Sequence, residues 1–314
     1  MDAKVFTVEN RKGGVAKTTT AVTLACGLAQ RLQASGGRVL LVDLDPQGDA
    51  ARALGLSPEG RCLSYVLTGE GTLRDNVISA DRSADGGPSR PNLFVLPASD
   101  NLRGAKETLL SQLTVNMVMA QIRGRNTNGE VVPMVAILDE RLGPARKVFD
   151  YIILDCPPTL DMLQEAVHQF ADAAIVPVKA DFHSTSAAGR HTRNILDDQA
   201  SGIKIAIRAI VPTFVDYRLR LTRSMLQQLT KTYGSLVTMP IPHTVRVAEA
   251  PASGGQTIIE YSPESPASAA YWNLVDTIYN GAGGDANSSA GEANGAGGDA
   301  GSGGDDAYDS GGEV

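Results

Sequence analysis

Hydrophobic residues along the chain gather in short continuous runs that alternate with longer stretches of mixed pattern. These runs predict buried strands at residues 4–8, 38–45, 151–155, 173–178 and 203–211. Apolar runs without polar alternation are typical of parallel strands that are covered on both faces. Residues 18–30 and 270–279 are predicted helices. Strands alternating with helices predict an α/β fold with a doubly wound, mostly parallel sheet and right-handed crossovers.

A glycine-rich turn separates the first predicted strand from the first predicted helix. Its sequence is Lys12-Gly13-Gly14-Val15-Ala16-Lys17-Thr18-Thr19. In such a turn, backbone N–H groups and the positive helix end bind phosphates. Lys17 is then expected to reach the β- and γ-phosphates, and the Thr18 hydroxyl to face Mg²⁺. The usual spacing of a phosphate loop needs glycine at positions 11 and 16, where this chain has Arg11 and Ala16.

Acidic residues follow two of the predicted strands. Asp43 and Asp45 end the run at 38–45, and Asp155 ends the run at 151–155. In a parallel sheet these carboxylates meet at the carboxyl edge, beside the phosphates. Asp155 is predicted to hold Mg²⁺ through water, as in a Walker B strand, with Asp43 also in the metal shell. The alternative for a single strand-end aspartate is that it caps the next helix.

The order K-G-G-x-x-K-T-T resembles the deviant Walker A loop of the ParA/MinD family of P-loop ATPases, and the segments VDLDPQG and DYIILDCPPTL resemble the family's later motifs. In that family the early lysine, Lys12 here, reaches across a dimer interface to phosphates bound by the other subunit. The resemblance therefore implies that ATP binding drives formation of a sandwich homodimer. It also implies that Asp45 positions or polarises the attacking water. Relatives usually have glycine at the position of Ala16, where a methyl group restricts φ.

Two later segments narrow the resemblance to the partition ATPases of the ParA/Soj type. Residues 211–218 resemble the loop after a late strand in these proteins, and residues 241–251 resemble their I-P-x-x-V-R-x-x-E-A-P signature. By that resemblance Thr213 and Pro242 lie near the adenine, and Arg218 and Arg246 belong to a basic surface that binds DNA without sequence preference. The match covers about residues 4 to 279 and departs from the family at His243 and around residues 121–147.

The resemblance implies a DNA partition ATPase that uses ATP and Mg²⁺ and hydrolyses ATP when stimulated by a ParB-like centromere-binding partner. Such a protein is expected in the cytoplasm, on the nucleoid. The alternative is a MinD-like ATPase that positions another cargo or a membrane-associated complex, which needs a terminal basic amphipathic helix. An iron–sulfur carrier needs paired cysteines, whereas Cys26, Cys62 and Cys156 are scattered. No apolar run reaches the length of a membrane span, so no membrane partner is predicted.

Charge is distributed unevenly along the chain. The formal net charge is −7, yet seven of the 35 acidic residues lie in residues 281–314, which contain no Lys or Arg. Residues 1–280 are therefore neutral, with 28 residues of each sign, and are predicted to form one P-loop ATPase domain. DNA binding must then depend on a local cluster of basic residues. The acidic, glycine-rich residues 281–314 are predicted to be a disordered tail because they contain few apolar residues.

Residues 121–147 occupy a stretch that is shorter in most relatives of the family. Residues 131–138 are apolar enough for an extra strand or a short helix, and basic residues surround them. A structural insertion is the favoured interpretation. A contact surface for DNA or a partner is the alternative.

Overall fold

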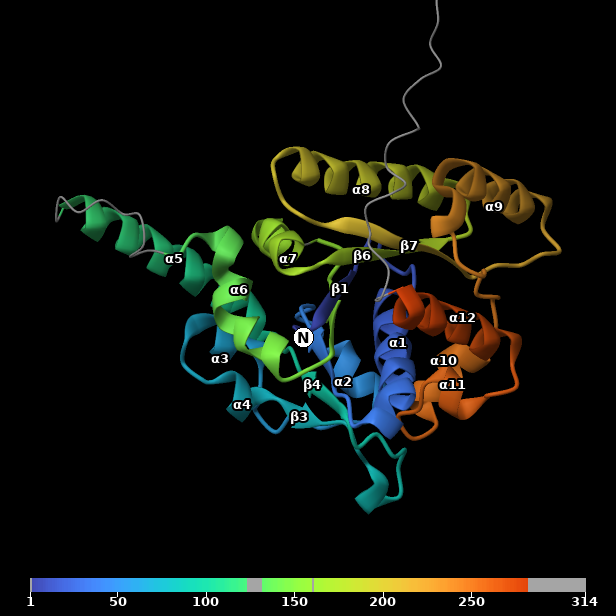
Figure 1. Cartoon of the computed structure of the whole chain (residues 1–314), viewed down its shortest axis with the longest axis horizontal. Helices are drawn as coiled ribbons and strands as arrows, with labels where there is room; N and C mark the ends of the chain where they lie inside the picture. The colour runs from blue at the N-terminus through green and yellow to red at the C-terminus, as the bar shows by residue number, and fades with distance from the viewer. Residues whose placement is uncertain (1, 123–131, 160, 282–314) are drawn as a thin grey trace, which may run out of the picture. The chain divides into compact units, whose positions relative to one another are not determined.

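The structure, a computed structural model, describes residues 2–122, 132–159 and 161–281. At its centre is a seven-stranded sheet in the order β3-β4-β2-β5-β1-β6-β7, with helices on both faces (Figure 1). Neighbouring strands pair in parallel except β3 and β4, which are antiparallel. The predicted doubly wound, mostly parallel α/β fold is confirmed.

The strands agree closely with the hydrophobic runs, and the two that the sequence did not predict, β3 and β4, are short. The strands span Lys4–Val8 (β1), Val39–Asp43 (β2), Ile78–Ser79 (β3), Leu93–Leu96 (β4), Tyr151–Asp155 (β5), Ala173–Lys179 (β6) and Ala206–Thr213 (β7). The helices span Lys17–Leu32 (α1), Asp49–Ala53 (α2), Leu63–Thr68 (α3), Leu73–Asn76 (α4), Asn101–Ile122 (α5), Ile137–Leu142 (α6), Gln164–Phe170 (α7), Phe182–Ala200 (α8), Arg220–Tyr233 (α9), Arg246–Ala252 (α10), Ile258–Tyr261 (α11) and Pro266–Gly281 (α12).

The continuous apolar runs are explained by burial on both faces of the sheet. In β2, Leu40 and Val42 belong to one core cluster, and Val39 and Leu41 belong to the other. Helices α1 and α12 cover the second face, while α3, α6 and α7 cover the first. Because successive side chains of a strand point to opposite faces, most positions of a doubly covered strand are apolar, and the acids stand where β2 and β5 end.

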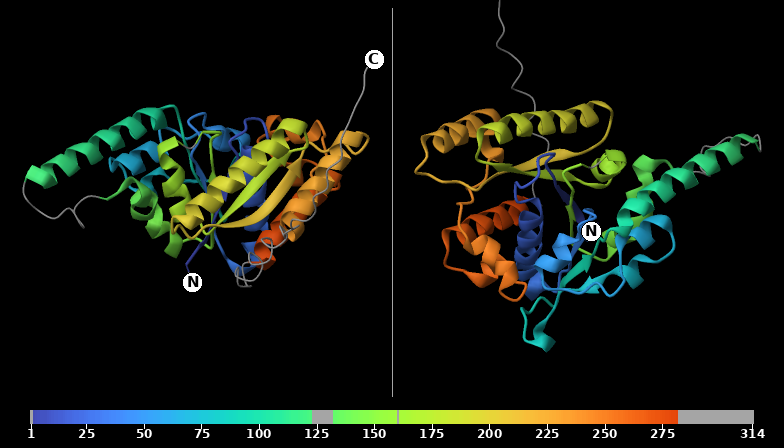
Figure 2. Two further views of the ribbon diagram at one scale, coloured as in Figure 1. Left: turned by 90° about the horizontal axis from the view of Figure 1, so that it is seen from above. Right: turned by 180° about the vertical axis from the view of Figure 1, so that it is seen from behind.

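The region around residues 121–147 is helical where the structure describes it. Residues 134–136 form a 3₁₀ turn that leads into α6, so the short-helix alternative is correct there and the extra strand is not formed. Helix α5 projects away from the sheet (Figure 2). Residues 123–131 and 282–314 lie outside the described residues, so the predicted tail and the domain boundary stay predictions. Within the described ranges, no helix is both long and apolar enough to cross a membrane.

Helices α1 and α12 pack closely through a glycine. Gly27 of α1 is buried, and a Cβ atom at this position would clash with Cγ2 of Val275 on α12. Gly104 of α5 offers a contrast, because a Cβ atom there would meet no atom within 4 Å.

We expect Gly27→Ala to lower the free energy of unfolding by about 1–2 kcal/mol, because overpacking outweighs the gain in helix propensity. Gly104→Ala should raise it by about 0.5–1 kcal/mol, because only the propensity gain applies there. Urea unfolding of both variants measures the difference. Equal effects of the two substitutions would show that α1 and α12 accommodate the added Cβ atom without a loss of stability.

Candidate nucleotide-binding site

The glycine-rich turn lies at the carboxyl end of the central strand β1 and leads into α1. Strand β1 pairs with β5 on one side and β6 on the other, so the loop lies above the middle of the sheet. Lys17 begins α1 and is only 7% exposed. Its Nζ donates a hydrogen bond of 3.1 Å to the carbonyl oxygen of Lys12, which closes the loop around the lysine.

Three side-chain hydrogen bonds hold the loop in place. Asn10 Nδ2 donates to the carbonyl of Pro177 at 2.8 Å, and Asn10 Oδ1 accepts from the Lys12 N–H at 2.9 Å. On the other side, the Thr213 hydroxyl donates to the carbonyl of Val15 at 3.2 Å. The loop is therefore tied to the ends of β6 and β7 before any ligand binds.

Ala16 has a left-handed backbone conformation, with φ 69° and ψ 35°. This conformation brings an L residue's Cβ close to the following carbonyl, whereas glycine has no Cβ to clash. The departure from glycine at this position therefore introduces strain into the loop. The chain adopts this loop shape at a conformational cost.

Asp43 and Asp155 are register partners on β2 and β5, and both are fully buried. Asp43 Oδ1 accepts from the Asp45 N–H at 2.9 Å, and its Oδ2 accepts from the Ala50 N–H at 3.1 Å. Asp43 thus accepts from the turn after β2 and from the first turn of α2, whose N-cap residue is Gly48. Its place in the metal shell stays a prediction. Neither oxygen of Asp155 has a hydrogen-bond partner of normal geometry among the described residues.

Burial raises the pKa of both carboxyl groups, that of Asp43 to about 7, and the charge of Asp43 raises the pKa of Asp155 further. The nearby Thr18 hydroxyl and Lys17 oppose the rise at Asp155 only in part. A buried carboxylate without a well-formed hydrogen bond is unfavourable unless a cation compensates it. Asp155 beside the Thr18 end of the loop therefore fits a hard cation such as Mg²⁺, which prefers oxygen ligands and retains water.

Desolvation lowers the pKa of the Lys17 ammonium, an effect that Asp155 opposes.

Asp45 lies at the turn after β2 and is half-buried. Its Oδ1 accepts from the Gln47 N–H at 3.0 Å, and its carbonyl accepts from the Gly48 N–H at 3.0 Å. These bonds hold Asp45 in a tight turn at the same sheet edge as Asp155. Its water-positioning role stays a prediction.

The predicted cross-subunit lysine, Lys12, has an ion pair within its own chain. Its Nζ lies 2.8 Å and 3.1 Å from the two carboxylate oxygens of Asp181, which follows β6. The lysine side chain is 30% exposed. Asp181 was not predicted from the sequence, although an acid just beyond a predicted strand was the same signal that identified Asp43 and Asp155.

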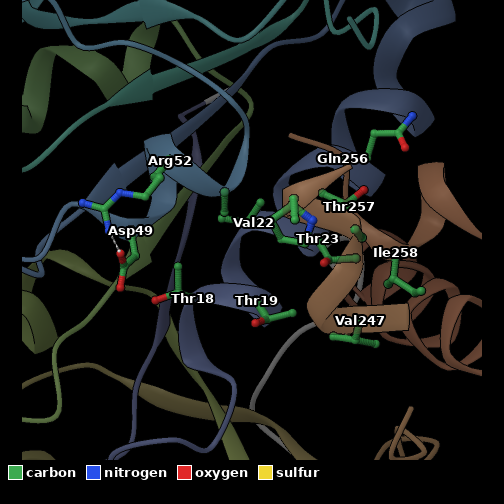
Figure 3. A pocket seen from close by; sticks show the side chains of 14 residues that line it. Thr18, Thr19, Val22, Thr23, Asp49, Arg52, Val247, Gln256, Thr257 and Ile258 are labelled. Carbon is green, nitrogen blue, oxygen red and sulfur yellow. Dashed lines mark hydrogen bonds and ion pairs between the residues drawn. The ribbon is translucent and has the colours of Figure 1, made fainter. Parts of the chain in front are cut away.

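A cavity of about 430 Å³ lies beside the first turn of α1 (Figure 3). Thr18, Thr19 and Thr23 line it on one side, facing Val247 and other residues of the α10 region. Neither Thr213 nor Pro242 lines this cavity. Thr213 is 1% exposed and holds the loop backbone, so the predicted adenine contacts of this pair stay predictions.

The predicted DNA-binding arginines lie on a loop and at the start of a nearby helix. An isolated bridge joins Val215 to Pro242, which places the loop after β7 beside the loop before α10. The Arg218 side chain, on the first of these loops, is 89% exposed and pairs with Asp216.

Arg246, which begins α10, is exposed and donates to the Ser262 hydroxyl at 2.9 Å. It therefore faces solvent, as Arg218 does. Arg220 and Arg223 add further exposed charge on α9. Their binding to DNA stays a prediction.

A buried histidine connects the start of the loop to two helices. His168 of α7 is fully buried, and its Nε2 lies 2.9 Å from Glu9 Oε1, immediately after β1. Its Nδ1 pairs with Asp198 Oδ2 on α8. Burial lowers the pKa of His168, but the hydrogen bonds and charges of both carboxylates outweigh this and raise it overall. No sequence signal joined these three residues, because they are far apart along the chain.

The phosphate loop on a central parallel strand, with carboxylates at the ends of the neighbouring strands, defines a P-loop nucleoside triphosphatase. The sequence matches the family described as AAA domain over residues 3–201. The chain belongs to this family and is an ATPase of the ParA/Soj type.

Relatives match over nearly their whole length. The chromosome-partitioning ATPase Soj of Thermus thermophilus is 34% identical, with 86% of this chain and 92% of the relative covered. The chromosome partitioning protein ParA of Caulobacter vibrioides is 30% identical, with 88% and 93% covered.

Solved structures show the same fold. Cobyrinic acid a,c-diamide synthase from Mycobacterium smegmatis, with bound ADP and magnesium, has a TM-score of 0.65 at 27% identity, covering 89% of this chain and 95% of that protein. The cell division ATPase MinD of Pyrococcus furiosus has a TM-score of 0.65 at 19% identity, covering 88% and 99%.

We expect Ala16→Gly to raise the free energy of unfolding of the nucleotide-free protein by about 0.5–1 kcal/mol, because glycine tolerates a positive φ. The matched control is Ala248→Gly, on the exposed face of α10, which should lower it by about 1 kcal/mol. Urea unfolding measures both values. A loss of stability in both variants would mean that the loop conformation does not strain Ala16.

The raised pKa of His168 predicts a pH-dependent stability. The protonated ring stabilises the fold fully below its unfolded pKa of about 6.5, and this contribution is lost as pH rises through the raised folded pKa. We expect His168→Gln to flatten the fall in unfolding free energy as the pH rises above about 6.5. The exposed His243→Gln variant should keep the wild-type slope. If the unfolding free energy of His168→Gln changed with pH in the same way as that of the wild type, His168 would not be charged in the folded protein.

Proposed function

We propose that this protein is a DNA partition ATPase that forms an ATP sandwich dimer, binds DNA without sequence preference and hydrolyses ATP when a ParB-like partner stimulates it. The observation that carries the proposal is the pair of lysines on one loop. Lys17 is enclosed by the loop, whereas Lys12 lies partly exposed at its rim, held by Asp181. A second, accessible lysine suits a contact with phosphates outside its own chain.

Within the site, Lys17 and the backbone of residues 13–19 bind the phosphates of ATP. The Thr18 hydroxyl and Asp155 hold Mg²⁺, with Asp43 supporting them from the adjacent strand. Bound Mg²⁺ neutralises charge that develops on the phosphates. Asp45 orients the water that attacks the γ-phosphate. The related synthase structure, solved with ADP and magnesium, supports this choice of nucleotide and metal.

The relatives named as chromosome-partitioning proteins support a role on DNA. Exposed arginines on the loop after β7, on α9 and at the start of α10 give the folded domain a local positive surface, which is what a neutral domain needs to bind a polyanion. The proposal places the protein in the cytoplasm, associated with the nucleoid. The partner is a centromere-bound protein of the ParB type.

The first experiment separates the two lysines. With a non-hydrolysable ATP analogue, Lys17→Ala should lose nucleotide binding, because the phosphates lose their enclosed cation. Lys12→Ala should bind the analogue as a monomer and fail to dimerise, as measured by size exclusion with light scattering. Asp181→Ala is the matched control, because it breaks the same ion pair while retaining the lysine. Normal dimers of Lys12→Ala would refute the cross-subunit role.

The second experiment tests the DNA surface. We expect Arg218→Glu combined with Arg246→Glu to remove most ATP-dependent DNA binding while basal ATP hydrolysis persists, so that only a weak residual affinity is left to measure. Fluorescence anisotropy across a salt series should show a shallower slope, by about one unit of log K per log[salt] for each phosphate that the protein no longer neutralises. Arg61→Glu combined with Arg103→Glu controls for net charge, since both residues are exposed elsewhere. Equal binding by the two double variants would exclude this surface.

A further inference from the structure

A second cavity, of about 700 Å³, lies at the opposite edge of the sheet from the phosphate loop. Arg38, which precedes β2, and Phe149, which precedes β5, both line it. The phosphate loop and its carboxylates lie at the carboxyl ends of these parallel strands, whereas this cavity lies at their amino ends. Residues of α4, of the edge strand β3, of the neighbouring strand β4 and of the segment 141–148 form its other walls. The cavity is therefore separate from the nucleotide site.

The floor of the cavity is apolar. Phe94 and Phe149 meet edge to face, with ring centroids 5.7 Å apart. Leu73 and Val77 also line the cavity and pack against the core cluster beneath it. At its rim Val148 is 52% exposed. Cavities of this size with mostly apolar walls are typical of small-molecule sites.

The charged part of the lining is cationic. Arg38, Arg74 and Arg141 line the cavity, and no carboxylate of a described residue does. Arg141 Nε is buried without a hydrogen-bond partner. The carboxylate that pairs with Arg141, that of Glu140, is 3.5 Å from Nη1, which is too long for a strong charge-assisted bond. A buried N–H without an acceptor is unfavourable. The Arg141 guanidinium, whose side chain is 31% exposed, therefore keeps hydrogen-bonding capacity that the described residues do not use.

Neighbouring acids do not neutralise the other two arginines. Asp75, next to Arg74, accepts a 2.6 Å hydrogen bond from the Thr72 hydroxyl. Asp150 accepts from the backbone N–H of Arg38. Within the described residues, the side chains of Arg38 and Arg74 make no ion pair. Three guanidinium groups thus surround an aromatic floor with little of their charge compensated by protein.

We propose that this cavity binds a small amphipathic organic anion, with an aromatic or acyl body on Phe94 and Phe149 and one acid group on Arg74 and Arg141. The apolar floor takes the body because its burial removes apolar surface from water. The arginines select an acid because a planar guanidinium binds carboxylate, sulfonate or phosphate oxygens in bidentate geometry. A ligand here would lie at the amino ends of β2 and β5. The carboxyl ends of the same two strands hold Asp43 and Asp155.

The test uses two probes that differ in charge. 8-Anilinonaphthalene-1-sulfonate has the predicted chemistry, and N-phenyl-1-naphthylamine has the same aromatic body without the acid. Fluorescence titration of the full chain should show tighter binding of the sulfonate. Arg74→Ala and Arg141→Ala should each weaken sulfonate binding by about tenfold and leave the neutral probe unchanged. Arg61→Ala, on an exposed arginine outside the cavity, should change neither.

Two further measurements locate the probe. Ser79→Trp places a large side chain in the cavity from an exposed position of β3, so binding of both probes should be lost. Saturating Mg²⁺-ADP should leave sulfonate binding unchanged. Displacement of the sulfonate by Mg²⁺-ADP, or equal binding by Arg74→Ala, Arg141→Ala and Arg61→Ala, would overturn the proposal.

Discussion

The parallel pairing of β2, β5 and β1 at the centre of the sheet is the constraint on which the site depends. In this register Asp43 lies opposite Asp155, and Asp155 lies opposite Val8, the last residue of β1. The strand pairing alone thereby brings two carboxylates and a phosphate loop to one edge of the sheet. The pairing also forces both carboxylates into the interior, where their charge is unfavourable.

The structure compensates the two buried carboxylates in different ways. Asp43 receives two backbone N–H groups and so serves as a turn-forming acceptor. Asp155 has no well-formed hydrogen bond from the described residues, and Lys17 is the cation among them that opposes its raised pKa, so its charge is left for a ligand to balance. The buried Asp155 carboxylate therefore lowers the stability of the ligand-free fold. Binding of metal and nucleotide offsets this loss.

Much of this could be predicted from the sequence, and the reasons for the failures are physical. Strands β1 and β5 were predicted with their observed bounds, because burial on both faces leaves an unbroken apolar run. Strand β3 has two residues and no such run, so its antiparallel pairing to β4 was not foreseen. The loop and the strand-end acids follow from local spacing. Partners such as Asp181 and Asp198 come from elements far apart in the chain, which only the fold brings together.

The ion pairs around the start of the loop have a consequence for how the site can change. Glu9 is tied to α7 and α8 through His168, and Lys12 is tied to Asp181 at the end of β6. In the proposed dimer Lys12 must exchange its carboxylate for a phosphate of the other subunit. That exchange breaks the Lys12 ion pair of Asp181, a carboxylate that also lies 3.8 Å from Lys179 Nζ, while Glu9 still holds α8 through His168 and Asp198. Because the buried network of Glu9, His168 and Asp198 does not include Lys12, it can hold β1 against α7 and α8 whether or not Lys12 leaves Asp181, and the β1–β5 pairing keeps the loop beside Asp155.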